Sequence, residues 1–353
     1  MMNIQELLQL AVDRKASDLH LMANKPPILR IDGVLMPLST YPPFTVDQVF
    51  DLVQQLLTSQ QKEILLVNRE IDFSFEFSNQ GRFRVNAYYQ KGSVAASLRL
   101  IPLLVFDIDQ LGLPKICHTF ATLKQGFILI AGPTGHGKST TLAAILNEIN
   151  QTRAEHIVTI EDPIEFILPP GRSIISQREI HGDTHSWEIA LRSCLREDPN
   201  VVLVGEMRDY ETISAALTVA ETGHLVFATL HTNSCAQTID RIVDVFPEQS
   251  KSQVRMQLSL TLEAVVSQRL VPALNGGRIL GYEIMTATSA IRTVIREGKT
   301  HMVDNIIQTS SELGMRTLES RLAELVKNGK ISLETARSYA LRPEDLARAV
   351  REK

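Results

Sequence analysis

Long hydrophobic runs, a basic charge excess and clustered cysteines are all missing from this sequence. The longest apolar runs, such as residues 127–131 and 201–204, are far shorter than the roughly 20 residues that a membrane-spanning helix needs. The first residues, MMNIQELLQLAVDRK, lack the apolar core and cleavage site of a signal peptide. We therefore expect a cytoplasmic protein with no direct membrane insertion, which reaches a membrane only through partners.

The cysteine and charge counts argue against two further classes. Cys117, Cys194 and Cys235 stand far apart and form no CxxC pair, so neither a disulfide framework nor a four-cysteine zinc site is expected. The formal net charge is −4, and the first 100 residues hold ten basic and ten acidic side chains. A nucleic-acid-binding surface would need a basic excess. DNA translocation is therefore disfavoured, and no nucleic-acid partner is expected.

The first 100 residues have the pattern of an α+β domain. Helical spacing of apolar residues over 3–15 is followed by β-rich stretches at 18–22 and 28–38, the second turning at Asp32-Gly33. A helical stretch at 46–67 then precedes three strand-like runs, at 71–77, 82–89 and 94–101. We predict an antiparallel sheet in a domain spanning 1–100.

The remaining residues have the pattern of an α/β domain followed by helices. Residues 101–115, which contain Pro102 and Pro114, are predicted to form an interdomain linker anchored by its apolar side chains. Within 116–285, buried-strand patterns alternate with helical stretches, which is typical of a parallel, helix-flanked sheet; they lie at 127–131, 157–160, 201–204 and 225–230. The region 286–353 is predicted to be helical.

A glycine-rich motif between a β-run and a helix is the strongest chemical signal. It matches GxxxxGK[ST], which binds nucleotide phosphates through backbone N–H groups, a helix N-terminus, a lysine and a hydroxyl that ligates Mg²⁺. The candidate nucleotide-binding residues are Gly132, Pro133, Thr134, Gly135, His136, Gly137, Lys138, Ser139 and Thr140. The ring of His136 is expected to face solvent.

Three further segments follow buried-strand patterns and carry polar side chains. VTIEDPIEF presents Glu161, Asp162 and Glu165, which either orient an attacking water or form an exposed acidic loop. VVLVGEMRD ends in Glu206, an imperfect Walker B match because that motif usually ends in Asp. His224 and His231 flank the last strand pattern, and on the residues alone a structural role is favoured for both histidines.

Together these segments resemble the type II/IV secretion ATPases and, within them, the PilT-type retraction ATPases of type IV pili. GPTGHGKST is similar to the family's Walker A motif, VTIEDPIEF to its Asp box, LREDPNVVLVGEMRD to its Walker B motif and TGHLVFATLHT to its His box. The resemblance spans essentially the whole chain. It implies a PAS-like N-terminal domain, a RecA-like P-loop ATPase domain and a helical C-terminal region.

The resemblance also implies a role for each site residue. Glu165 becomes the general base, and Glu206 joins Ser139 near Mg²⁺. His224 and His231 become the His-box residues, which reverses the structural interpretation above. Arg84 and Arg99, with Arg82 in reserve, become the arginines that the N-terminal domain supplies to ATP.

Two features resemble the retraction branch of the family. The cysteine-clustered zinc module and longer N-terminal region of the assembly ATPases are not seen, and AIRTVIRE at 290–297 is similar to the retraction signature AIRNLIRE. Thr293-Val294 replaces the usual Asn-Leu, and His136 replaces the usual serine. The resemblance implies a homo-hexamer that acts on an inner-membrane platform protein at the pilus base, alone or with a partner retraction ATPase.

Two alternatives stay open at this point. The chain could be an accessory retraction motor, or an assembly ATPase of a pilus or secretion system. A different class would be a nucleotide-dependent regulatory binding module, against which the intact Glu165 and Glu206 argue.

Overall fold

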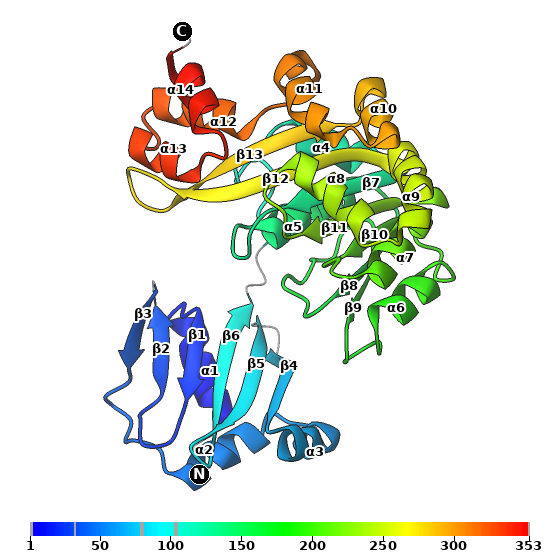
Figure 1. Cartoon of the computed structure of the whole chain (residues 1–353). Helices are drawn as coiled ribbons and strands as arrows, with labels where there is room; N and C mark the ends of the chain where they lie inside the picture. The colour runs from blue at the N-terminus through cyan, green and yellow to red at the C-terminus, as the bar shows by residue number, and fades with distance from the viewer. Residues whose placement is uncertain (1–2, 32, 78–80, 102–104, 352–353) are drawn as a thin grey trace. The chain divides into compact units, whose positions relative to one another are not determined.

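The computed structural model describes residues 3–31, 33–77, 81–101 and 105–351, which divide into two compact units. The first unit comprises Met1–Leu104 with Glu165–Ile167, and the second comprises Val105–Ile164 with Leu168–Lys353. Each unit contains its own sheet (Figure 1). Part of the predicted linker, 102–104, lies outside the described residues, and the domain boundaries remain predictions.

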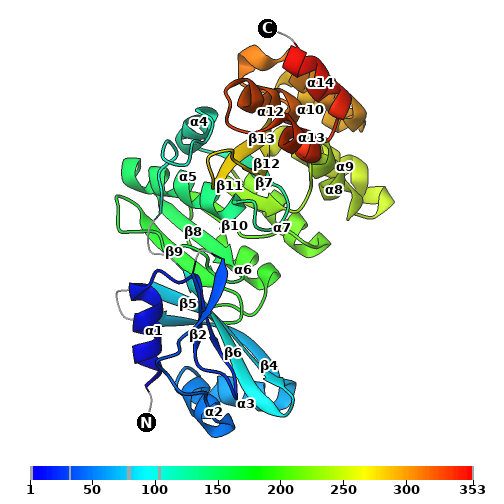
Figure 2. The same ribbon diagram turned by 90° about the vertical axis from the view of Figure 1, so that its left-hand side faces the viewer.

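The first unit is built on an antiparallel sheet in the order β3-β2-β1-β6-β5-β4. One sheet face is apolar and packs against three helices through residues such as Leu19, Phe83 and Leu98, while the other face is polar. Figure 2 shows α1 alongside these strands. The elements are α1 (Ile4–Asp13), β1 (Asp18–Leu21), β2 (Ile28–Ile31), β3 (Val34–Pro37), α2 (Val46–Gln54), α3 (Ser59–Asn68), β4 (Glu70–Phe77), β5 (Gly81–Gln90) and β6 (Ser93–Ile101). Strands β2 and β3 pair as the predicted hairpin, although Asp32 of its turn lies outside the described residues.

The single helical stretch predicted at 46–67 is wrong, because the structure has two helices there. Thr58 forms a capping box at the start of α3: its hydroxyl accepts from the Gln61 N–H at 3.3 Å, and the Gln61 side chain accepts from the Thr58 N–H at 2.9 Å. Such a cap satisfies N–H groups that have no partner within the helix, and so favours a new helix start. Leu56 and Leu57 between the helices are buried in the core of this unit.

The second unit is built on a sheet in the order β13-β12-β7-β11-β10-β8-β9. Neighbours from β12 to β9 are parallel, and β13 pairs antiparallel with β12. The strands are β7 (Gly126–Ala131), β8 (His156–Glu161), β9 (Ile174–Glu179), β10 (Val201–Val204), β11 (Leu225–Leu230), β12 (Leu262–Pro272) and β13 (Arg278–Thr286). Strands β7, β8, β10 and β11 match the four predicted runs, whereas β9, β12 and β13 were not predicted because polar residues interrupt their apolar pattern.

Helices cover both faces of this sheet, which explains the continuous apolar strands. On β7, Ile128 and Ile130 belong to the core that contains α4 and α5, whereas Phe127 and Leu129 belong to the core that contains α6, α7, α8 and α9. The helices are α4 (Ile116–Thr122), α5 (Lys138–Thr152), α6 (Trp187–Cys194), α7 (Tyr210–Glu221), α8 (Cys235–Asp244) and α9 (Glu248–Thr261).

The C-terminal region is helical, as predicted. It contains α10 (Ser289–Glu297), α11 (Val303–Thr309), α12 (Leu318–Lys327), α13 (Leu333–Tyr339) and α14 (Pro343–Arg351). Leu318 and Leu322 of α12 pack with Leu346 of α14 and with Val271 of β12. The predicted fold class is therefore confirmed: an α+β unit, a helix-flanked parallel sheet and a helical C-terminal region.

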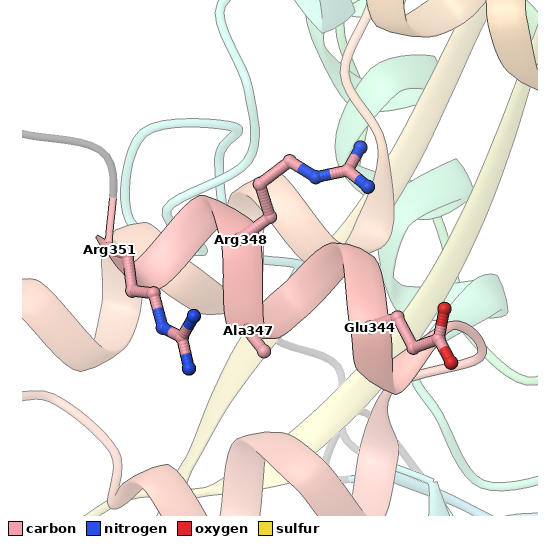
Figure 3. Close-up of a pocket in the computed structure, with 4 residues that line it drawn as sticks. All are labelled: Glu344, Ala347, Arg348 and Arg351. Carbon is pink, nitrogen blue, oxygen red and sulfur yellow. The ribbon is translucent and has the colours of Figure 1, made fainter.

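A hollow of about 450 Å³ is lined by one face of α14, with Glu344, Ala347, Arg348 and Arg351 around it (Figure 3). None of the helices in the part of the chain that the structure describes combines the length and apolar character that a bilayer crossing requires.

A buried carboxylate on β13 predicts an unusual pH dependence of stability. Glu283 is 1% exposed, accepts from the Cys235 N–H at 2.7 Å and lies 3.3 Å from an Nη atom of Arg342. Burial raises the pKa of Glu283 above its ordinary value, and the neighbouring Asp304 adds to this effect, which the Cys235 hydrogen bond and Arg342 only partly oppose. The folded chain thus holds this proton more tightly than the unfolded chain. The free energy of unfolding therefore falls as pH rises from the ordinary pKa of a glutamate to the raised pKa of Glu283.

We therefore expect Glu283→Gln to raise the melting temperature at pH 7, because the amide keeps the acceptor for Cys235 without a buried charge. The gap to wild type should close as pH falls toward the ordinary pKa of a glutamate. Melting curves recorded from pH 4 to pH 8 would measure this, with exposed Glu312→Gln as the control. A lower melting temperature for Glu283→Gln at pH 7 would mean that the Arg342 ion pair outweighs burial.

Candidate active site

The candidate residues of the second unit gather where parallel strands end. Because β7, β11, β10 and β8 are parallel, their carboxyl ends meet at one sheet edge. The loop after β7 holds the glycine motif, the loop after β11 begins with His231, and the loop after β10 contains Glu206. We call residues 132–137 the glycine loop.

All three glycines of this loop, Gly132, Gly135 and Gly137, have a positive φ that other residues rarely adopt. Gly132 has φ +144°, and a Cβ there would lie 2.4 Å from the carbonyl oxygen of Gln268. Gly137 has φ +81° and caps α5, which begins at Lys138. Local geometry therefore requires glycine at Gly132 and places a helix N-terminus at the end of the loop.

Lys138 folds back over the glycine loop. Its Nζ donates to the carbonyls of Gly132 at 2.8 Å and Pro133 at 3.1 Å, and its side chain is only 8% exposed. The same Nζ lies 3.5 Å from Nδ1 of His231. One buried cation thus stands between the glycine loop and the end of β11.

His231 links the glycine loop to Glu206. Its Nε2 lies 3.0 Å from Oε1 of Glu206, and its Nδ1 lies 3.2 Å from the hydroxyl of Thr134. Burial lowers the pKa of His231, and the Lys138 charge lowers it further despite the attraction of Glu206. Since Lys138 can only donate, the contacts fit a neutral imidazole that accepts at Nδ1 and donates from Nε2.

Glu206 is held ionised by its neighbours. Burial favours its neutral form, but hydrogen bonds from Arg208 and the positive charges of Arg208 and Lys138 outweigh burial and lower its pKa. Arg208 contacts both oxygens, with Nε at 2.6 Å from Oε1 and an Nη atom at 2.7 Å from Oε2. This bidentate contact presents a charged carboxylate beside the lysine and the histidine. The sequence reasoning missed Arg208, which stands two residues after Glu206 in the same motif.

The solvent-facing ring predicted for His136 is wrong. Its Nδ1 accepts from the Leu270 N–H at 2.9 Å, so the ring is directed at β12. Burial lowers the pKa of His136, and the positive charges of Arg269, Lys138 and Arg278 lower it further, which favours the unprotonated Nδ1 that this contact needs. The prediction failed because β12 had not been recognised as a neighbour of the loop.

The structure does not bring His224 to the glycine loop. It directly precedes β11, its carbonyl accepts from the N–H of Gly126 at 3.0 Å, and its Nδ1 lies 3.1 Å from the carbonyl of Val219. Both Gly126 and His224 stand at the amino ends of their strands, whereas the glycine loop and His231 stand at the carboxyl ends. A strand of this length spans about 20 Å. The spacing of His224 and His231 in the sequence could therefore have indicated that the two histidines lie far apart.

The acidic residues at the end of β8 and just after it have different surroundings. Glu161 is buried, accepts from the Thr159 hydroxyl at 2.7 Å, and is followed by a cis Asp162–Pro163 bond. Ile164 donates to Glu179 at 3.1 Å, while Glu165 and the next two residues group with the first unit. The role of Glu165 therefore stays a prediction.

Arg84 and Arg99 lie side by side on the sheet of the first unit. They are cross-strand partners on β5 and β6, and Arg99 is in turn opposite Asp18 of β1. Nε of Arg99 donates to Asp18 at 2.9 Å, and Asp18 is 6% exposed. Burial opposes the charge of Asp18, but hydrogen bonds from Arg99 and Ser17 outweigh it and lower its pKa. Sequence reasoning missed Asp18, because only the antiparallel register of β1 and β6 shows that Asp18 lies opposite Arg99.

Comparisons with known proteins agree with this architecture. The family described as "Type II/IV secretion system protein" matches residues 1–277. The type IV pilus retractation ATPase PilT of Pseudomonas aeruginosa is 48% identical over 98% of this chain and 100% of its own. A twitching motility protein of Neisseria gonorrhoeae is 47% identical over 91% of this chain and 86% of its own.

A solved structure extends the similarity to three dimensions. The crystal structure of the pilus retraction motor PilT with bound ADP has a TM-score of 0.93 and 45% identity, and it covers 99% of this chain and 100% of its own. The similarity thus includes both units and the C-terminal helices. The chain belongs to the type II/IV secretion system protein family and, within it, to the PilT-type retraction ATPases.

Proposed function

We propose that this chain is an ATP-hydrolysing motor that acts as a homo-hexamer and powers retraction of a type IV pilus. The observation that carries the proposal is the gathering of Lys138, His231 and Glu206 around a glycine loop at one sheet edge. The similarity to PilT along the whole chain supports the same function. ATP is the substrate.

The glycine loop fits a phosphate group. Gly132 and Gly137 allow the backbone to curl, α5 adds the positive potential of a helix N-terminus, and Lys138 supplies a cation. We assign ATP binding to the nine residues named above for the motif, from Gly132 to Thr140. Ser139 and Glu206 would hold Mg²⁺, which neutralises charge on the β- and γ-phosphates.

Hydrolysis requires a base and charge stabilisation. Glu165 orients a water for in-line attack on the γ-phosphorus and takes its proton, while the bond to the ADP oxygen breaks. His231 holds the Glu206 carboxylate beside the glycine loop, and His224 belongs to the same His box at the other end of β11. Arg84 and Arg99 stabilise charge on the transferred phosphoryl group, and Arg82 is the third candidate for this role.

Work requires that ATP-bound and empty subunits favour different arrangements of their two domains across the 101–115 linker. Six subunits firing in turn would act on an inner-membrane platform protein and release pilins from the pilus base. The motor would act at the cytoplasmic face of the inner membrane through such partners, alone or with a second retraction ATPase.

Deleting the gene in its host and counting surface pili tests this function. We expect hyperpiliated cells that no longer twitch, because extension continues without retraction, and rescue by wild type but not by Lys138→Ala. Loss of pili would instead indicate an assembly ATPase. If the purified chain releases no phosphate from ATP, it is a regulatory module. If DNA stimulates its ATP hydrolysis at low salt, it is a DNA translocase.

A further inference from the structure

We infer that Gln268 is a positioning residue for nucleotide binding: its side-chain amide holds the His136–Gly137 peptide so that the Gly137 N–H faces the bound phosphates. The inference rests on the proposed function, since it concerns the same glycine loop. It adds a residue of β12 that no motif of the sequence includes.

The amide of Gln268 bridges the glycine loop and helix α5, which follows it. Its Nε2 donates to the carbonyl of His136 at 2.8 Å, and its Oε1 accepts from the hydroxyl of Thr141 at 3.0 Å. Gln268 is 1% exposed. The His136 carbonyl fixes the orientation of this buried amide, because turning the amide over would oppose one acceptor to another, whereas the Thr141 hydroxyl can donate or accept.

The backbone of β12 holds the same loop at two further points. The carbonyl oxygen of Gln268 occupies the space beside Gly132 where a side chain would begin, and the Leu270 N–H donates to Nδ1 of His136 at 2.9 Å. Strand β12 thus contacts the glycine loop at its start and near its end. Such contacts leave the loop little freedom to rotate its peptide groups.

The orientation of one carbonyl determines the orientation of the next N–H. The His136 carbonyl and the Gly137 N–H belong to one planar peptide group, and in a trans peptide they point in opposite directions. Since the carbonyl is directed at Gln268 on β12, the Gly137 N–H is directed away from β12. The hydrogen bond from Gln268 on one side of the loop thereby orients the Gly137 N–H toward the opposite side.

The sheet order shows what lies on that side. Strand β7, from which the loop emerges, stands between β12 and β11, and β10 follows β11. The carboxyl ends of β11 and β10, with His231 and Glu206, therefore lie on the side of β7 away from β12. This is the side on which Lys138 contacts His231, and where the proposed function places the phosphates.

Three substitutions separate this role from simple packing. Gln268→Glu keeps an acceptor for Thr141 but loses the donor to His136 when ionised, and Gln268→Met loses both at similar volume. Thr141→Val is the matched control, because it removes the other end of the bridge and leaves the His136 contact. For each variant we would measure Kd for Mg-ADP, KM and kcat for ATP, and the melting temperature without nucleotide.

We expect both Gln268 variants to raise Kd and KM about tenfold or more, the scale of a lost hydrogen bond to a charged group. Their kcat at saturating ATP should change less, since this contact binds ground state and transition state alike. Thr141→Val should bind Mg-ADP nearly as wild type does. A purely structural role would lower the melting temperature and the active fraction without moving KM.

Three results would overturn the inference. These are an unchanged Kd for Mg-ADP in folded Gln268 variants, an equal loss of Mg-ADP affinity in Thr141→Val, or the failure of both Gln268 variants to fold. The last result would make the residue structural. Failure of the wild-type chain to bind Mg-ADP would instead refute the proposed function. The two failures are therefore distinguishable.

Discussion

Replacing Glu165 by Gln is expected to leave Mg-ATP binding intact and to lower the rate of hydrolysis by about 10²–10⁴-fold, the usual contribution of a general base. The amide has nearly the shape of the carboxylate but cannot take a proton from the attacking water. Binding should persist because the proposed phosphate contacts come from the glycine loop and Lys138. Equilibrium binding of a fluorescent ATP analogue and steady-state phosphate release would measure the two effects.

The matched control for this variant is Glu63→Gln, an exposed substitution on α3 of the same compact unit. It should retain wild-type rates, because it removes the same charge away from the proposed site. Hydrolysis by Glu165→Gln at the wild-type rate would refute the assignment of the base. Loss of ATP binding in Glu165→Gln would show that the residue supports the fold or the pocket instead.

Replacing Gly132 by Ala is expected to weaken Mg-ADP binding by at least about tenfold and to lower the melting temperature. The new Cβ would lie 2.4 Å from the Gln268 carbonyl oxygen at a φ of +144°, so the start of the glycine loop has to move. Backbone strain of this kind costs about 1–3 kcal/mol, and moving the loop disturbs the amides that the phosphates need. Calorimetric titration with Mg-ADP and thermal melting would test this.

Gly329→Ala separates the two causes. Gly329 also has a positive φ, +63°, but nothing lies within 4 Å of a Cβ built there. Its substitution should therefore show the cost of conformation alone, about 1 kcal/mol, with unchanged nucleotide affinity. An equal loss of affinity in both variants would mean that general destabilisation, and not the contact with Gln268, weakens binding.

Local sequence predicted the parts of this protein that local chemistry governs. Strands β7, β8, β10 and β11 could be predicted because each is a short apolar run buried on both faces. The glycine loop could be predicted because its backbone needs glycine and its function needs Lys138. The break between α2 and α3 was missed, although Thr58 and Gln61 carry a capping-box pattern that signals it.

Pairing between strands that are far apart in the sequence decided which polar side chains meet. Strand direction brings His231 to the glycine loop and leaves His224 at the opposite sheet edge, although both histidines flank one strand. The place of β12 beside β7 brings Gln268 and Leu270 to His136, and the antiparallel register brings Asp18 to Arg99.

The amino-acid sequence by itself therefore determined the nucleotide motif, the strands on which it depends and the family. The tertiary structure alone decided which polar side chains face one another at that motif. The physical reason is that strand propensity and glycine geometry depend on neighbours in the chain, whereas sheet order and register depend on the burial of surfaces far apart in the chain.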